Sequence, residues 1–361
     1  ISINPKHELG DSPYRYNWQT PILLSPHNQD ILYMGSNKLL RSMNQGETFS
    51  VISDDLTTGG KKGNVPYGTL TAISESPFQF GMIYTGSDDG YINLTTNGGG
   101  SWTRVSDNLP QGLWVSRVIA SQHKLERVYA TLNGSRNDDF KVYAYISEDM
   151  GKTWKSITNG ISNAPVNVIK EDTKDENILY LGIDNGVYAS FDRGNSWHEF
   201  SNGLTKAAVH DLVVHPEAND LVVGTHGRSI YKADISDLQK YSTIGTKAIT
   251  VFKPSPVQMP RFRGRSFEPS ATITFYSKAK ATQGINILSK GGTLLNSIKV
   301  NADKGFNYAN YDLTMSSGGR KDLMKEDSKL NIPKAQNGKY YLPKGTYTIE
   351  IGSQKTTLEI K

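Results

Sequence analysis

Residues 147–154 read SEDMGKTW, one copy of a pattern, Ser/Thr-x-Asp/Asn-x-Gly-x-Ser/Thr-Trp/Phe, that decides the fold of this chain. The pattern occurs as SMNQGETF at 42–49, TTNGGGSW at 95–102, SEDMGKTW at 147–154 and SFDRGNSW at 190–197. Successive copies start about 43 to 53 residues apart, close to the length of one four-stranded blade of a β-propeller. The sequence therefore predicts consecutive blades, one for each copy.

Each copy has the composition of a clamp across a hairpin turn. Its Asp or Asn can accept hydrogen bonds from backbone N–H groups two or three residues further on. Its glycine permits a positive φ, and its closing ring can fill the space between neighbouring sheets. We predict a structural role, because an active site is built once whereas the clamp recurs. The clamp residues are Asn44, Asn97, Asp149, Asp192, Gly46, Gly99, Gly151, Gly194, Phe49, Trp102, Trp154 and Trp197.

Four short apolar stretches recur around each clamp, most clearly in 166–200, with the clamp expected between the third and fourth strands. A fifth unit starts at VHDLVVHP (209–216) and ends without a clamp or a fourth strand. Propellers close by completing their last blade, and an open sheet edge invites association. We therefore expect another segment to cover this edge.

The clamp pattern ends before residue 235, and the pattern of apolar and polar residues then changes. Alternating apolar stretches such as ATITFYSK (271–278) and TYTIEIG (346–352) favour a β-sandwich. The polar segment 314–339 is expected to be a long surface loop. The predicted fold class is all-β, with propeller blades followed by a sandwich. The predicted boundaries are an N-terminal linker at 1–17, blades at 18–240 (four complete, the fifth partial), a connector at 241–268 and a sandwich at 269–361.

Composition narrows the functional classes. The chain has no cysteine, which excludes disulfides and thiolate-bound metals, and no apolar run approaches the roughly 18 residues of a membrane span. HxH and HExxH spacings are absent, so we expect no catalytic zinc, other metal or cofactor. The 40 Lys and Arg are scattered among 35 Asp and Glu, which argues against nucleic-acid binding. The nearest basic–aromatic cluster, interpreted as a solvated connector, is Arg261, Phe262, Arg263, Arg265 and Phe267.

Loops on one face of a propeller converge on its axis, where side chains from several blades can meet a ligand. Outside the clamps, the loops supply aromatic rings for stacking and arginines for bidentate hydrogen bonds. Tyr67 is a further aromatic of this kind. The candidate ligand-binding residues are Trp18, Trp114, Arg117, Arg136, His226 and Arg228.

A glycosidase needs two carboxyl groups, roughly 5 to 9.5 Å apart. The same aspartates are also ordinary turn formers, and the sequence does not bring any two of them together. A sialidase would need an arginine triad, but Arg117, Arg136 and Arg228 do not stand in the settings that sialidases use. The catalytic residues are left unassigned. The weak candidates are Asp88, Asp89, Asp138 and Asp139, with Asp184 as a further loop carboxylate.

The clamps resemble the Asp-box, or bacterial neuraminidase repeat, of sialidases, xyloglucan-cleaving endoglucanases and the sortilin receptor propeller. Longer phrases, such as YRYNWQTPILLSPHNQDILYMGS (14–36) and VVGTHGRSIY (222–231), look like the C-terminal part of large bacterial sortilin-like repeat proteins. Those proteins are often catalogued as glycosyl hydrolases. The tail from about residue 250 also resembles theirs, a small immunoglobulin-like or flagellar-hook-cap-like module.

The resemblance implies a longer parent protein with further blades ahead of residue 1. It also implies export, with a place at the cell surface, in an outer-membrane assembly or outside the cell. We predict a non-catalytic recognition or assembly protein that binds glycan or protein through its propeller. The alternative is a glycoside hydrolase that acts on a polysaccharide with two loop carboxylates. The expected partners are the missing N-terminal blades or a partner chain, with glycan as a possible ligand.

Overall fold

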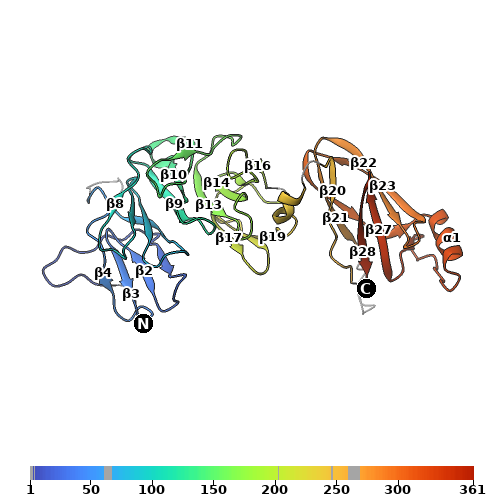
Figure 1. Ribbon diagram of the computed structural model, residues 1–361, viewed down its shortest axis with the longest axis horizontal. Coiled ribbons are helices and arrows are strands. Elements are labelled where there is room, and N and C mark those ends of the chain that lie inside the picture. The colour runs from blue at the N-terminus through green and yellow to red at the C-terminus, as the bar shows by residue number, and fades with distance from the viewer. Residues whose placement is uncertain (1–2, 4, 61–66, 202, 245–246, 259–268) are drawn as a thin grey trace. The chain divides into compact units, whose positions relative to one another are not determined.

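The computed structural model describes residues 3, 5–60, 67–201, 203–244, 247–258 and 269–361. It divides into two compact units, Ile1–Gln239 (unit 1) and Lys240–Lys361 (unit 2), and both are built mainly from strands (Figure 1). The all-β prediction is confirmed. The basic–aromatic cluster around Arg263 lies outside the described residues. Among the described helices, none has the length and apolar composition needed to cross a bilayer.

Unit 1 consists of five consecutive antiparallel sheets, the blades of a β-propeller, each formed by strands that follow one another in the chain (Figure 1). Blade 1 contains β1 (Ile22–Leu24), β2 (Leu32–Gly35), β3 (Leu39–Ser42) and β4 (Ser50–Val51). Blade 2 contains β5 (Leu70–Glu75), β6 (Ile83–Ser87), β7 (Ile92–Thr95) and β8 (Thr103–Arg104). Blade 3 contains β9 (Trp114–Ala120), β10 (Val128–Gly134), β11 (Asp139–Ser147) and β12 (Lys155–Ser156).

Blade 4 contains β13 (Val166–Glu171), β14 (Leu179–Ile183), β15 (Gly186–Ser190) and β16 (His198–Glu199). Blade 5 has three described strands, β17 (Val209–His215), β18 (Asp220–Thr225) and β19 (Ile230–Asp234), as its missing clamp suggested. Two short 3₁₀ helices are also present among the described residues. Ser135–Asn137 lies between β10 and β11, and Leu238–Thr243 follows β19.

Every clamp lies on the turn between the third and fourth strands of its blade. In blade 3, the Gly151 N–H donates to Ser147 Oγ at 2.8 Å, and the Thr153 N–H donates to Asp149 Oδ1 at 2.8 Å. The same two bonds hold the other three clamps. The Asp or Asn side chain therefore reaches four residues on, instead of two or three, because the Ser or Thr hydroxyl already accepts the nearer glycine N–H.

The hydrogen bonds of the clamp also act on the charge of Asp149. Burial alone would raise the pKa of this carboxyl, but bonds from Thr153 and Ser147 hold the pKa below its ordinary value of 3.8. Gly151 has a φ of 86° and follows Met150, whose φ is 62°, so two successive residues adopt the left-handed conformation. A Cβ on Gly151 would stand 2.9 Å from Val105 of the preceding blade, so the glycine serves the close approach as well as the turn.

The closing tryptophan of a clamp joins its blade to the preceding one. The indole N–H groups of Trp102, Trp154 and Trp197 donate to the carbonyls of Ile52, Val105 and Ile157, at 2.9, 2.7 and 2.6 Å. The ring was predicted to fill the space between sheets, but this directional bond was not. The phenyl ring of Phe49, in the first clamp, has no N–H group with which to form this bond.

Buried glutamates add a second link between some blades. Glu75 of blade 2 accepts hydrogen bonds from Ser25 Oγ at 2.6 Å and from the hydroxyl of Tyr33 at 3.0 Å, both in blade 1. Glu171 of blade 4 accepts equivalent bonds from blade 3. Because a buried carboxylate is costly unless it is bonded, these contacts fix the mutual position of the paired blades.

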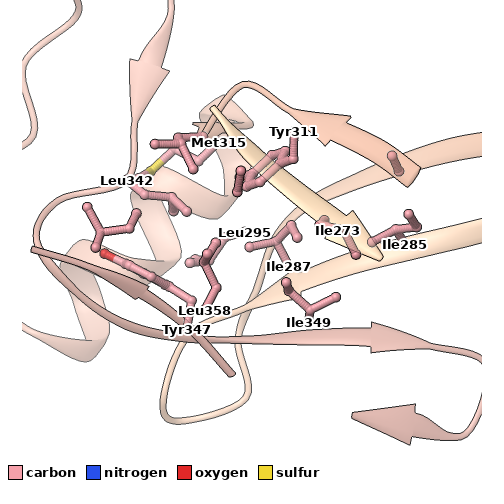
Figure 2. Close-up of a cluster of buried hydrophobic side chains, with 14 of the residues drawn as sticks. Ile273, Ile285, Ile287, Leu295, Tyr311, Met315, Leu342, Tyr347, Ile349 and Leu358 are labelled. Carbon is pink, nitrogen blue, oxygen red and sulfur yellow. The ribbon is translucent and has the colours of Figure 1, made fainter. Parts of the chain in front are cut away.

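Unit 2 is built from two larger sheets around one hydrophobic core. One sheet has the order β20 (Ile249–Val251), β21 (Ala271–Ser277) and β24 (Gly305–Tyr311). The other has the order β23 (Leu294–Ala302), β22 (Ala281–Leu288), β27 (Gly345–Ile351) and β28 (Gln354–Ile360). Figure 2 shows core side chains from both sheets gathered in one cluster, including Ile273, Ile287 and Ile349. The immunoglobulin-like assignment of this unit stays a prediction.

Two segments of unit 2 differ from expectation. The predicted surface loop at 314–339 contains β25 (Thr314–Met315) and helix α1 (Ser317–Glu326), which Ser316 caps by accepting the Gly319 N–H. β25 pairs with β26 (Tyr340–Tyr341), and Leu323 of the helix is buried in the core. The loop prediction was wrong because the few apolar residues of this segment, such as Leu323, are surrounded in the sequence by charged residues and form no clear periodic pattern. Within the predicted connector, β20 pairs with β21 and so extends the sheet.

We expect the indole bond to contribute measurably to stability. Trp197→Ala should lower the free energy of unfolding by about 3 to 5 kcal/mol, because Trp197 is buried and its removal leaves a cavity. Trp197→Phe should cost about 1 kcal/mol, chiefly by leaving the Ile157 carbonyl without its donor. Urea unfolding followed by circular dichroism would measure both. Trp18→Ala is the matched control, since Trp18 is 93% exposed, and a loss equal to that of Trp197→Ala would contradict the assignment.

Candidate functional site

A pocket of about 870 Å³ opens on unit 1, and all five blades line it. The first strand of every blade contributes, through Ile22, Thr71, Arg117, Asn167 and His210. Residues from sheets far apart in the sequence therefore converge on one hollow. This arrangement is the axial site of a propeller, where loops and inner strands meet.

The pocket brings together most of the candidate ligand-binding residues. Its lining includes Trp18, Trp114, Arg117, Arg136 and His226. Arg228 is exposed and is not among the lining residues, and neither is Tyr67. Asp184 is the one loop carboxylate from the sequence analysis that lines the pocket.

Irregular strand pairing turns a second set of side chains into the pocket. The register between first and second strands shifts at the same place in blades 2 to 5. Such bulges re-aim a side chain. The residues passed over are Thr71, Ser116, Asn167 and His210, and all four line the pocket. The sequence analysis missed them, although a polar residue after an apolar one, at the same point in four repeats, was a usable signal.

Two tryptophans lie in different settings in this pocket. Trp18 is 93% exposed, so its indole faces solvent at the edge of the lining. Trp114 is half-buried, and the guanidinium carbon of Arg136 lies 3.8 Å from the centroid of its ring. At this distance the cation is attracted to the π face of the indole. This contact holds the guanidinium of Arg136 beside Trp114 in the lining of the pocket.

Amide groups connect blades 3 and 4 along the pocket. Asn133 Nδ2 donates to Asn167 Oδ1 at 2.9 Å, and Asn167 Nδ2 donates to Asp184 Oδ1 at 2.8 Å. Each amide is oriented by its neighbour, so the chain of bonds presents fixed donors and acceptors. A polar ligand would meet a prearranged set of hydrogen-bonding groups here.

Charged groups from blades 3 and 5 meet on the opposite part of the lining. Arg117 Nη2 lies 2.9 Å from Asp211 Oδ1, whereas Arg117 Nε is buried without a hydrogen-bond partner among the described residues. The rings of His210 and His226 lie 5.2 Å apart. Burial, assisted by the charge of Arg117, holds the pKa of Lys170 below its ordinary value. This part of the lining therefore contains an arginine–aspartate ion pair beside two imidazole rings.

The weak catalytic candidates lie elsewhere. Asp88 is buried and accepts bonds from the Tyr67 and Thr69 N–H groups at 2.8 and 2.9 Å. Asp89 is buried too, and its carboxylate binds Thr58 and Ser87. Asp138 is exposed in a left-handed turn, and Asp139 accepts the hydroxyl of Tyr143 at 2.7 Å. None of the four lines the pocket.

Comparisons with known proteins agree with this description. Residues 142–284, less than half of the chain, match the family model of sortilin, neurotensin receptor 3. The chain is thus similar to sortilin-type propellers, as the clamps indicated. No curated protein sequence matches it significantly.

Two solved enzymes have a similar structure. An ancestral GH74 enzyme is 15% identical, with a TM-score of 0.50, and the alignment covers 99% of this chain and 47% of that one. The GH74 xyloglucanase from Xanthomonas campestris is 10% identical, with a TM-score of 0.49, and the alignment covers 96% of this chain and 55% of that one. The chain spans about half the length of either enzyme. At such identity the likeness to the ancestral enzyme shows the propeller fold alone.

We expect Asp88 to behave as a structural residue. Asp88→Ala should lower the free energy of unfolding by about 1 to 3 kcal/mol, because it removes the acceptor of two backbone N–H groups, of which that of Thr69 is buried. Asp138→Asn, in an exposed turn whose left-handed conformation Asn tolerates as well as Asp does, should change it by less than about 0.5 kcal/mol. Thermal or urea unfolding measures both. An Asp88→Ala protein of unchanged stability would show that its hydrogen bonds do not hold the loop.

Proposed function

We propose that this chain is a non-catalytic recognition module that binds a glycan in the axial pocket of its propeller. The observation that carries the proposal is the pairing of an exposed indole with an ordered set of polar groups in one hollow. Trp18 supplies the ring, and the amides of Asn133 and Asn167 supply donors and acceptors. Ligand sites commonly combine apolar rings with a few placed polar groups of this kind.

The chemistry of a sugar suits both the indole and the amide groups of this lining. The C–H face of a pyranose ring is apolar and can stack on an indole, which is rigid and loses little entropy on contact. Hydroxyl groups both donate and accept, as do the amide side chains along blades 3 and 4. A flat apolar protein segment would leave those amides without partners, which would cost free energy.

A glycoside hydrolase is the alternative, and the pocket offers it two carboxylates, Asp184 and Asp211. A glycosidase needs one carboxyl group that carries a proton to the leaving oxygen. Asp211 is instead held in an ion pair by Arg117, and Asp184 accepts the Asn167 amide. Both carboxylates are thus already engaged by side chains of the protein, so the geometry supports binding over hydrolysis.

The proposal predicts that Trp18 governs glycan affinity. A glycan array followed by calorimetry should identify a binder, and Trp18→Ala should weaken its binding at least about tenfold, or about 1.4 kcal/mol. Phe140→Ala is the matched control, since Phe140 is 55% exposed and does not line the pocket. Release of reducing sugar ends that Asp184→Asn abolishes would establish the hydrolase instead. A folded protein that binds no glycan on the array would refute the proposal.

We also propose that the two outer faces of the blade series pack against further blades, from the same protein or from a partner chain. Blades 1 and 4 can be aligned through the pairing of their first and second strands, because Leu23 pairs with Tyr33 in blade 1 and Lys170 pairs with Tyr180 in blade 4. In this alignment Ile22 and Leu24 of blade 1 correspond to Ile169 and Glu171 of β13. The two β13 residues are 0% and 1% exposed, against 55% and 60% for Ile22 and Leu24. Blade 5 exposes Ile230 in turn. Uncovered repeat ends of this kind favour association.

Residues 1–361 expressed alone should accordingly self-associate, which sedimentation velocity over a concentration series would show. Leu24→Glu should shift the population toward monomer, because a charge is excluded from an apolar contact. Leu294→Glu is the control, since Leu294 is 51% exposed in unit 2. A stable monomer at all concentrations would contradict the packing proposal and leave the glycan site untouched.

The proposed location follows from the resemblance to exported repeat proteins. A glycan-binding propeller outside the membrane would meet polysaccharide at the cell surface, in an outer-membrane assembly or in the medium. Fractionation of cells that express the complete natural protein would test this placement. Recovery in the cytoplasm alone would refute it.

A further inference from the structure

We propose that the glycan bound in this pocket carries a carboxylate, as a uronic acid does, and that Arg136 binds that group. The inference rests on the glycan-binding function proposed above and specifies the class of sugar. It follows from the different settings of the two tryptophans, which assign them different tasks.

Arg136 is an exposed cation that is held in place without being neutralised. Its guanidinium carbon lies 3.8 Å from the centroid of the Trp114 ring, and no described carboxylate forms an ion pair with it. The N–H groups of a guanidinium lie in its plane, so stacking leaves them free to donate. A planar fork of donors matches the two oxygens of a carboxylate.

Arg117 is engaged differently. Its Nη2 is paired with Asp211 at 2.9 Å, so the charge of this arginine is already balanced. Asp184 is likewise occupied, as an acceptor of the Asn167 amide. Of Arg117 and Arg136, the two described arginines that line the pocket, Arg136 is therefore the one whose charge no described carboxylate balances.

The surroundings of the pocket add to this preference. Arg117 also lines the pocket, and its Nε–H group is buried without a hydrogen-bond partner among the described residues. His210 and His226 place two more rings with N–H groups on the same lining. The carboxylate of an acidic sugar would gain from these N–H donors and from the charge of Arg136, whereas a neutral sugar would gain less.

The roles of the two indoles then separate. Trp114 is a positioning residue, because its ring holds Arg136 and one of its faces is covered. Trp18, whose ring is 93% exposed, is the stacking surface for the sugar. Substitution of Trp18 should weaken the binding of acidic and neutral glycans alike. Substitution of Arg136 should remove the preference for glycans that carry a carboxylate.

The test compares oligogalacturonate, alginate and hyaluronan oligosaccharides with their carboxyl-reduced forms, in which a primary alcohol replaces each carboxylate. Calorimetry at fixed ionic strength would measure the wild-type chain, Arg136→Gln, Arg136→Lys and Arg228→Gln. We expect at least one acidic oligosaccharide to bind the wild type at least about tenfold more tightly than its reduced form. Arg136→Gln should abolish that difference, because the acidic form loses its bidentate contact.

Arg136→Lys should keep only part of the preference, because an ammonium cannot form the bidentate contact. Arg228→Gln is the matched control, an exposed arginine outside the lining, and it should behave as the wild type. Equal binding of acidic and reduced forms by the wild type would overturn this inference while the glycan-binding function stands. No binding of either form, together with a blank array, would overturn both.

Discussion

The hydrogen bond from the indole of one blade to a backbone carbonyl of the preceding blade is the contact on which the architecture depends. A sheet that packs on a sheet through apolar side chains alone can slide, because burial has no direction. An N–H group that must meet one carbonyl removes that freedom. Clamp glycines allow the approach, and buried glutamates add a second bond in two of the interfaces. With the blades in fixed register, the bulges of their inner strands all open toward one pocket.

The clamps were predictable because their chemistry is local. Eight residues contain the acceptor, the turn glycine and the ring, and the periodic recurrence of the pattern located the hairpins of four blades. The bond from Trp154 to Val105 was not predictable in this way, since its acceptor is a backbone atom that any residue would supply. Helix α1 was missed for a related reason. Its composition is that of a solvated loop, and only the core beneath Leu323 makes it a helix.

The site was predictable in part. Exposed rings and arginines in loops between blades are few, so selection by residue type found Trp18, Trp114 and Arg136. The same selection could not separate a turn carboxylate that holds its own loop, as Asp88 does, from one that faces a pocket, as Asp184 does. It also did not find Asn167 or His210, because a bulge arises from the pairing of two strands and becomes visible in the sequence only when the repeats are compared with one another.

The direction of the indole bonds has a consequence for synthesis. Each tryptophan reaches back along the chain, by 50, 49 and 40 residues, to an acceptor that precedes it. A polypeptide that emerges from a ribosome or an export channel with its N-terminus first therefore always has the acceptor blade outside before the donor appears. Blades can be added in the order of their emergence, and none has to wait for sequence that has yet to be made.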